Sequence, residues 1–299
     1  MVRVGVIGAG YLGSFHIEKF LAINECNLVG IAEVSVSLRD ELKKKYSLPV
    51  YTDYRELLNK VDAVSIVVPT QFHYEIASFF IKNHIHTFIE KPVVKTVEQC
   101  EGLLSLAKEG VKIQVGHIER FNPVYKFLME KCENPRTITM RRKSPYTERG
   151  TDVDIVFDLM IHDIDIVLSL FPEKELSIKS IVAAKVMTDR NDYVKADCEI
   201  SGVSVTFEAS RVHNKKERTV TVVSDNVVFE GDFINQELFF KTKEGEYIFG
   251  QGKRDILLDE LRSFVLSVKE DKPVAVTLED GCRAVSEAYR VLSFCGKSK

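Results

Sequence analysis

The sequence has 299 residues, 45% of them hydrophobic, which is long enough for two domains with separate cores. Its 41 basic and 44 acidic residues leave a net charge of −3. No basic block is long enough to follow a phosphate backbone, so we expect no nucleic-acid partner. The apolar runs are far shorter than the ~18 residues of a membrane span, and a buried-strand pattern at the start leaves no room for a signal peptide. We therefore expect a cytoplasmic protein that binds no membrane.

The six cysteines are scattered, with no CxxC pair and no nearby histidine spacing. This distribution indicates neither a zinc site nor a disulfide framework. We expect reduced, mostly packed cysteines and no metal centre.

Short apolar runs alternate with amphipathic stretches along the first 116 residues. The runs predict strands at residues 2–8, 27–33, 63–69, 86–90 and 112–116, and the intervening periodicity predicts helices at 11–23, 37–46, 71–83 and 96–109. Alternation of this kind is typical of βαβ units around a parallel sheet. We expect an α/β protein whose first domain is a Rossmann dinucleotide-binding domain.

The pattern changes after Phe121. A short helix and a strand at residues 136–143 precede an apolar segment at 155–171, a β-rich stretch at 177–249 and two helices near 254–269 and 278–294. No flexible linker or repeat is visible. We expect domains at 1–119 and 120–299, the second an α/β domain with a large, mostly antiparallel open sheet.

Gly8, Gly10 and Gly13 form a G-x-G-x-x-G motif between the first strand and the first helix. The first glycine permits the turn, the second lets a pyrophosphate approach the backbone, and the third lets the helix pack on the strand. Backbone N–H groups at this helix start, including those of Tyr11 and Leu12, would face the phosphates. We expect these five residues to bind a dinucleotide.

Glu33 ends the second predicted strand, 20 residues after Gly13. A carboxylate there can hydrogen-bond the adenosine ribose 2′-hydroxyl and repel a 2′-phosphate, which favours NAD over NADP. Arg39 can bind a 2′-phosphate if its loop folds back. A solvated acid at the strand end is the alternative for Glu33.

Lys91 follows a predicted strand in the stretch FIEKP, residues 88–92. Ligands of open α/β sheets lie beyond the carboxyl ends of strands, so its ammonium can stabilise a developing alkoxide. An ordinary surface turn is the alternative.

On one helix, Asp154, Asp158, His162 and Asp165 would share a polar stripe about 80° wide, at 100° per residue. Asp158 and His162, four residues apart, can pair so that the carboxylate orients a basic imidazole. A buried core histidine and a divalent-cation site are the alternatives.

These motifs, with VVPTQFH at 67–73 and a closing stretch at 260–292, resemble the Gfo/Idh/MocA oxidoreductases over nearly the whole chain. The resemblance implies that Lys91 polarises the reacting hydroxyl, that His162 is the general base and that Asp158 supports it. It also implies cofactor contacts for Pro69, Thr70, His73, Glu90 and Lys91, and a homodimer or homotetramer formed through the second sheet.

GHIERFNP at 116–123 and the stretch from residue 141 look most similar to the family's UDP-N-acetylglucosamine 3-dehydrogenase branch. Arginine suits a diphosphate through its bidentate fork. Substrate contacts are therefore expected from Lys91, Asp158, His162 and members of a basic and polar set: Arg120, Asn122, Arg141, Arg142, Lys143 and Arg149. Asn122 can instead cap the helix that Pro123 begins, and the run Lys215, Lys216, Arg218 reads as a charged hairpin more readily than as a second anion contact.

The sequence thus predicts an NAD-dependent dehydrogenase that oxidises a sugar hydroxyl, with C3 of the sugar of UDP-N-acetylglucosamine as the leading target. Asp154, Ile155, Val156 and Met160 replace glycines that many members carry, so inositol or glucose ligands do not transfer directly. Another sugar or polyol, such as myo-inositol, is the alternative substrate. A non-catalytic NAD(H) sensor is the alternative function.

Overall fold

The computed structural model describes residues 1–107, 109–147, 153–250 and 252–296, which form two compact units. Unit 1 comprises Met1–Ile118 and Asp255–Cys282, and unit 2 comprises Glu119–Arg254 and the chain from Arg283 onward. The chain therefore first leaves unit 1 one residue before the expected boundary at 119/120. Unit 2 differs from the expected second domain at 120–299, because Asp255–Cys282 returns to unit 1.

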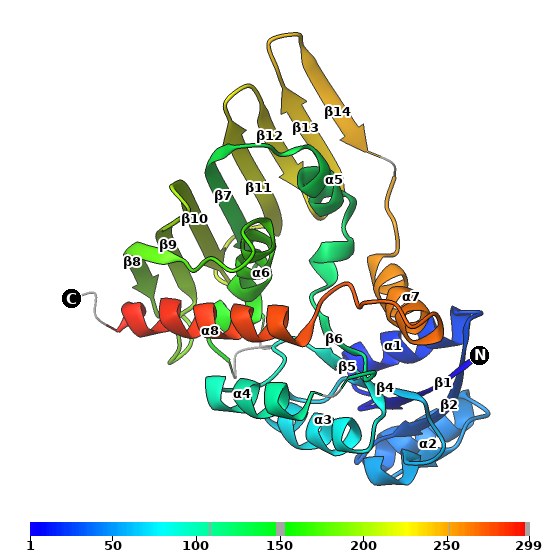
Figure 1. Ribbon diagram of the computed structural model, residues 1–299. Helices are drawn as coiled ribbons and strands as arrows, with labels where there is room; N and C mark the ends of the chain where they lie inside the picture. The colour runs from blue at the N-terminus through cyan, green and yellow to red at the C-terminus, as the bar shows by residue number, and fades with distance from the viewer. Residues whose placement is uncertain (108, 148–152, 251, 297–299) are drawn as a thin grey trace. The chain divides into compact units, whose positions relative to one another are not determined.

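Unit 1 is built on a six-stranded parallel sheet with the order β3-β2-β1-β4-β5-β6 (Figure 1). Its strands are β1 (Val2–Ile7), β2 (Cys26–Ala32), β3 (Val50–Tyr51), β4 (Ala63–Ile66), β5 (His86–Glu90) and β6 (Ile113–Gly116). Near-continuous apolar runs form them because helices cover both faces of such a sheet. Ile7 pairs with Ala32 and Ile66, so these carboxyl ends lie at one edge. The chain order reverses there, where doubly wound folds bind ligands.

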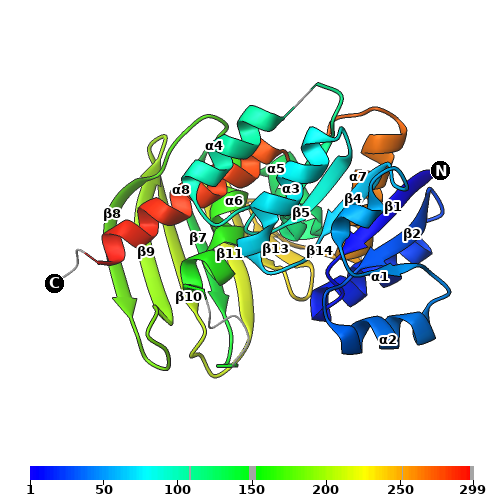
Figure 2. The same ribbon diagram turned by 90° about the horizontal axis from the view of Figure 1, so that it is seen from below.

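Helices α1 (Tyr11–Ala22), α2 (Val36–Lys45), α3 (His73–Lys82) and α4 (Val97–Leu106), with the short turns η1 (Tyr54–Leu57) and η2 (Thr70–Phe72), connect these strands. Figure 2 shows this sheet and its helices from below. Ser35 and Thr96 cap α2 and α4 by accepting backbone N–H groups. The predicted alternation of strands and helices is confirmed. The two-residue strand β3 was not predicted because it is too short to show a pattern.

Helix α7 (Ile256–Lys269) belongs to unit 1 because its apolar side faces the core of that unit. Leu261, Phe264 and Val265 are fully buried in the cluster that contains Phe20 and Phe88, and the Phe88 and Phe264 rings lie 5.8 Å apart. The amphipathic pattern predicts the helix itself, but not which sheet it covers.

Unit 2 contains an eight-stranded sheet with the order β14-β13-β12-β11-β7-β10-β9-β8, which Figure 1 shows as one continuous fan. The strands are β7 (Pro135–Lys143), β8 (Ser177–Ala184), β9 (Tyr193–Ile200), β10 (Val203–Ser210), β11 (Glu217–Ser224), β12 (Val228–Asp232), β13 (Glu237–Lys241) and β14 (Glu246–Gly250). All neighbouring pairs are antiparallel except β7 with β10. The expected large, mostly antiparallel open sheet is confirmed.

The remaining segments are η3 (Ile118–Phe121), α5 (Pro123–Lys131), the π-helical turn η4 (Val156–Met160), α6 (Ile161–Leu170) and α8 (Leu278–Cys295). Within unit 2, α6 and η4 pack on the sheet, and Tyr289 of α8 contacts Phe157 of η4. No helix among the described residues is long and apolar enough to cross a membrane. All six cysteines are free thiols, and four of them are buried.

Candidate functional site

The glycine loop of unit 1 has the geometry of a phosphate cradle. Gly8 has φ +88°, and a Cβ there would lie 2.5 Å from the Val67 carbonyl oxygen. A Cβ on Gly13 would lie 2.1 Å from the Gly8 carbonyl oxygen, whereas one on Gly10 would meet nothing within 4 Å. Gly8 and Gly13 therefore close the turn. Gly10 leaves open space in front of the backbone, as a bound pyrophosphate requires.

The N-terminus of α1 presents its first turn without a side-chain cap. Tyr11 and Leu12 in that turn are exposed, at 64% and 39%. Their backbone N–H groups stand where anions bind at helix starts. That Tyr11 and Leu12 bind the cofactor stays a prediction, and their backbone N–H groups are the groups that would do so.

A cavity of about 550 Å³, called here the nucleotide cavity, extends from this loop past the ends of β2 and β4. Gly8, Gly10, Glu33, Pro69 and Phe72 are among the residues that line it. Its mostly apolar wall with few polar groups is typical of cofactor sites. The cavity thus unites the glycine loop with Glu33 and Pro69, which the sequence predicts to bind cofactor. Thr70, at the start of η2, does not line it.

Glu33 is fixed beside the glycine loop by two backbone hydrogen bonds. Its Oε2 accepts from Ala9 N–H at 2.7 Å and its Oε1 from Ser35 N–H at 2.8 Å. Arg39 folds back to the same strand end, where its Nη1 donates to the carbonyls of Glu33 at 2.9 Å and Val34 at 2.7 Å. The Glu33 side chain therefore lies in the wall of the nucleotide cavity, and the Arg39 guanidinium bonds the backbone of the same residue.

Replacing Glu33 by alanine is expected to raise kcat/KM with NADP about tenfold, or ~1.4 kcal/mol, because a charge that repels a 2′-phosphate is removed. Arg39 already lies at the same strand end to pair with that phosphate. Initial rates with NAD and NADP give the ratio. The double variant Glu33→Ala/Arg39→Ala serves as the control and should lose the gain. A Glu33→Ala enzyme with no improved use of NADP would contradict this account of the preference.

His73 does not reach the nucleotide cavity with its ring, contrary to the expected cofactor contact. It is 1% exposed, and its two ring nitrogens lie 2.8 Å from the Val68 carbonyl and 3.0 Å from the Pro92 carbonyl. Burial lowers the pKa of this imidazole. His73 therefore connects the loop after β4 to the turn that carries Lys91.

Glu90, another predicted cofactor contact, is also buried, and its side chain does not line the nucleotide cavity. Its Oε2 accepts from the Lys91 N–H at 3.1 Å, and its Oε1 lies 3.1 Å from His16 Nε2. His16 Nδ1 lies 2.9 Å from Ser65 Oγ. Burial by itself raises the pKa of the Glu90 carboxyl, but His16 and Lys91 bring the pKa below its ordinary value. Lys91 itself is half-buried. Its backbone N–H is held by Glu90, the last member of a buried chain of contacts from Ser65 through His16 to Glu90.

Sequence reasoning assigned no role to His16, although it lies in the predicted helix at 11–23, shortly after Gly13. A signal was available, because His16 shares the core-facing side of α1 with Gly13, Ile17 and Phe20. A polar ring on such a side needs a partner.

In unit 2, the segment with Asp158 and His162 is not one uniform α-helix. Asp158 lies in the π-helical turn η4 and His162 in the first turn of α6. Both side chains are half-buried on a segment that is otherwise largely buried. π-Helical turns are rare and frequently occur at functional sites.

Two of the four residues of the expected polar stripe have internal partners. Asp154 is buried and caps the segment by accepting the Val156 N–H at 3.1 Å. Asp165 is 1% exposed and forms an ion pair with Arg120 at 2.6 Å. Asp158 and His162 remain the half-buried pair of this segment.

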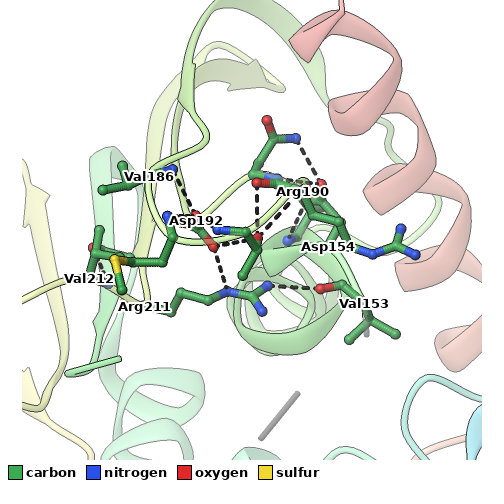
Figure 3. Close-up of polar contacts among 12 residues, drawn as sticks. Val153, Asp154, Val186, Arg190, Asp192, Arg211 and Val212 are labelled. Carbon is green, nitrogen blue, oxygen red and sulfur yellow. Dashed lines mark hydrogen bonds and ion pairs between the residues drawn. The ribbon is translucent and has the colours of Figure 1, made fainter. Parts of the chain in front are cut away.

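Arg211 and Asp192 hold the base of this segment (Figure 3). Arg211 Nη2 donates to the Val153 carbonyl at 2.9 Å, and its Nε lies 3.7 Å from Asp192 Oδ1. Asn191 donates from its backbone and side chain to Asp154 Oδ2, at 3.2 and 2.8 Å. Figure 3 shows Arg211 reaching between Asp192 and Val153. The loop before β9 and the residue that follows β10 thus fix where η4 begins.

The carboxyl of Asp192 has a lowered pKa in the folded protein. Although burial opposes it, hydrogen bonds from the backbone N–H groups of Met187, Val186 and Thr188 lower the pKa of Asp192 to about 2. A lowered pKa stabilises the fold above the unfolded-state value of about 3.9. That contribution is lost as the pH falls toward 2.

Asp192→Asn is therefore expected to lose about 2 kcal/mol of stability at neutral pH. Thermal midpoints of the two proteins should differ most above pH 5 and converge as the pH falls below 4. A gap between the midpoints that stays constant from pH 7 to pH 3 would show that the charge of Asp192 does not matter.

Most of the basic residues expected to bind substrate have internal partners. Arg142 is 2% exposed and bonds Glu119 at 2.9 Å and Asp163 at 2.7 Å. Arg120 pairs with Asp165 through two bonds, and Arg141 and Lys143 reach Glu208 at 3.4 and 2.9 Å. We therefore withdraw Arg142 as a substrate contact, since Glu119 and Asp163 occupy its guanidinium. Arg149 lies outside the described residues.

Asn122 also has a structural role in place of the expected contact with substrate. It is fully buried, its Oδ1 accepts the Val124 N–H at 3.1 Å, and its Nδ2 donates to the Phe233 carbonyl at 3.0 Å. It is the N-cap of α5, the alternative that Pro123 suggested. Among the described residues, no three His, Cys, Asp or Glu side chains gather as a metal site.

Comparisons with known proteins agree with this architecture. Residues 2–117 match the family model described as "Oxidoreductase family, NAD-binding Rossmann fold". The chain is 29% identical to UDP-N-acetylglucosamine 3-dehydrogenase of Acidithiobacillus ferrooxidans over 97% of this chain and 96% of the relative. A solved structure of that enzyme has a TM-score of 0.91 and covers 98% of this chain and 97% of its own.

A second relative, myo-inositol 2-dehydrogenase of Thermotoga maritima, is 26% identical over 96% of this chain and 94% of its own length. Both relatives therefore extend over the two units. From the matched model, the glycine cradle and these full-length similarities, we conclude that residues 2–117 form an NAD-binding Rossmann domain of the Gfo/Idh/MocA oxidoreductase type, and that the chain as a whole is similar to dehydrogenases that carry this domain.

Proposed function

We propose that this NAD-dependent sugar dehydrogenase oxidises the C3 hydroxyl of the N-acetylglucosamine of UDP-N-acetylglucosamine to a ketone. The full-length similarity to an enzyme of that name, at 29% identity, supports this substrate. The observation that supports cofactor chemistry is the glycine loop, which leaves open space at Gly10 and lines a cavity with Glu33.

The residues of unit 1 fit NAD. The open backbone at Gly10 and the start of α1 would receive the pyrophosphate, and Glu33 would receive the ribose hydroxyls. Bound NAD supplies the hydride acceptor of the reaction. Lys91 would place an ammonium charge at the hydroxyl oxygen, and the Ser65–His16–Glu90 chain would steady its backbone.

The residues of unit 2 supply proton transfer in this proposal. His162 would take the proton of the reacting hydroxyl, and Asp158 would favour the resulting imidazolium by its negative charge. Lys91 would stabilise the alkoxide oxygen that forms as the proton leaves. The π-helical turn at Asp158 and the clamp made by Arg211 and Asp192 would set where this pair stands.

A second substrate class is favoured by the 26% identity to a myo-inositol dehydrogenase. NADH formation at 340 nm, with a reagent that traps the ketone, tests both against UDP-glucose and free glucose. Turnover of UDP-N-acetylglucosamine alone is the expected result. Turnover of myo-inositol or glucose alone would overturn the nucleotide-sugar assignment. Since the matched model describes an oxidoreductase family and both full-length relatives are dehydrogenases, the NAD(H)-sensor alternative is not retained.

We also propose that copies of the chain assemble through the open sheet of unit 2. Ile248 on β14 is 79% exposed, and with Phe239 and Thr221 it lines a shallow cavity of about 450 Å³ over β11–β14. Apolar groups in such a position favour burial in an interface. Light scattering after gel filtration should give a dimer or tetramer mass; a monomer at micromolar concentration would refute the assembly.

A further inference from the structure

Arg218 is a half-buried cation of unit 2 with little to bind. It lies on β11 with 35% of its side chain exposed. Across the part of the chain that the structure describes, a single acceptor, Glu119 Oε1, lies near its guanidinium, at 3.4 Å. A guanidinium offers five N–H donors in a planar fork. Most of the hydrogen-bonding capacity of Arg218 is therefore available to a ligand.

Glu119, the acid beside Arg218, lies closer to Arg142. The same Glu119 oxygen accepts from Arg142 Nη1 at the shorter distance of 2.9 Å. Arg142 also donates two hydrogen bonds to Asp163 Oδ1, from Nε at 3.0 Å and from Nη2 at 2.7 Å. Burial and the neighbouring Arg142 charge lower the pKa of Arg218. The charge of Arg218 is thus poorly compensated where it stands.

Lys216 adds a further positive charge beside Arg218. It lies directly before β11, two residues from Arg218, and is exposed. Arg218, burial and Arg142 together lower the pKa of the Lys216 ammonium. Two neighbouring cations that repel each other favour an anion between them.

The position of Arg218 relates these two cations to the half-buried pair on η4 and α6. Arg218 lies opposite Arg142 in the pairing of β11 with β7, and Arg142 bonds Asp163, the residue that follows His162. An anion held by Arg218 would therefore bind on the same unit as Asp158 and His162, near the start of α6. A substrate with an anionic group next to its reacting sugar satisfies both sites at once.

We propose that Arg218 and Lys216 bind the diphosphate of the substrate, with Arg218 as the bidentate contact and Lys216 as the accessory charge. Arginine matches phosphate oxygens with parallel N–H bonds. The inference rests on the proposed function, since it names the group by which a nucleotide sugar is distinguished from a neutral polyol. In this proposal Arg218 takes the role in substrate binding that the sequence predicted for Arg142. Lys216 and Arg218, which the sequence favoured as part of a charged hairpin, are then binding residues.

Calorimetric titration of UDP into the full-length protein tests this subsite without turnover. Arg218→Gln should weaken UDP binding about ten- to hundredfold, as expected for lost hydrogen bonds to a charged group. Arg218→Lys should restore part of it, and Lys216→Gln should weaken it less. Uridine, which lacks the phosphates, should bind all these proteins equally.

The matched control is Arg136→Gln, which removes a 70% exposed arginine on β7 that pairs with Asp225. This variant should bind UDP as the wild type does, and NAD affinity should be unchanged in every variant. Equal UDP affinity of the wild type and Arg218→Gln would overturn the subsite. A wild type that binds no UDP would overturn it as well. Binding of UDP that depends on Arg218, without oxidation of any UDP-sugar, would support the subsite and refute the proposed reaction.

Discussion

Replacing His162 by glutamine should lower kcat about 10²- to 10⁴-fold, which is the usual contribution of a general base to the rate. Glutamine keeps a polar side chain of similar reach but cannot accept the proton. His162 is half-buried in the first turn of α6, directly after the π-helical turn with Asp158. Steady-state NADH formation gives kcat, and titration with NAD gives cofactor affinity, which should change less than about threefold because the residue lies in unit 2.

Two comparisons separate this role from that of a packed core histidine. The thermal midpoint of His162→Gln should stay close to that of the wild type, whereas loss of folding would favour the core-histidine alternative. Asp158→Asn should lower kcat less than His162→Gln does, because the carboxylate acts through the imidazole. If His162→Gln kept full activity, the assignment of the base would be wrong.

Replacing Lys91 by methionine should lower kcat about 10²- to 10³-fold, as loss of one preorganised group at a developing oxyanion does. Methionine keeps the length and apolar stem of the side chain. Lys91 follows β5, and its backbone N–H is held by buried Glu90. Its removal should act on kcat more than on the dissociation constant of NAD, since the charge matters most as the alkoxide forms.

Lys95→Met is the matched control, because Lys95 is exposed and lies four residues further along the chain. It should retain wild-type kcat. Lys91→Arg tests charge without shape and should recover only part of the rate, since a guanidinium is larger and planar. Equal activity of Lys91→Met and the wild type would remove Lys91 from the mechanism.

The glycine loop and the acid beside it could be predicted from local sequence because their requirements are local. A turn at φ +88° and an approach of 2.1 Å to a carbonyl admit only glycine at Gly8 and Gly13. The spacing from the glycine motif to Glu33 follows from one helix, α1, and one strand, β2. A short stretch of sequence therefore determines both the cradle and the acid that lines its cavity.

The parts that were not predicted depend on residues far apart in the chain. Arg142 looks like a phosphate contact until the fold brings Glu119 and Asp163 to it. Helix α7 returns to unit 1 because its apolar side meets Phe88 and Phe20. The π-helical turn leaves the apolar pattern intact, so periodicity at 100° per residue did not reveal it.

Transfer of hydrogen from C3 is the central claim, and it can be followed with UDP-N-acetylglucosamine carrying deuterium at C3. Mass spectrometry of the reduced cofactor after a single incubation with unlabelled NAD is the direct measurement. The account predicts that the deuterium appears in NADH and that its transfer is slower than that of hydrogen. Unlabelled NADH would place the oxidation at another carbon, and the absence of NADH with saturating substrate and a ketone trap would contradict the proposed reaction itself.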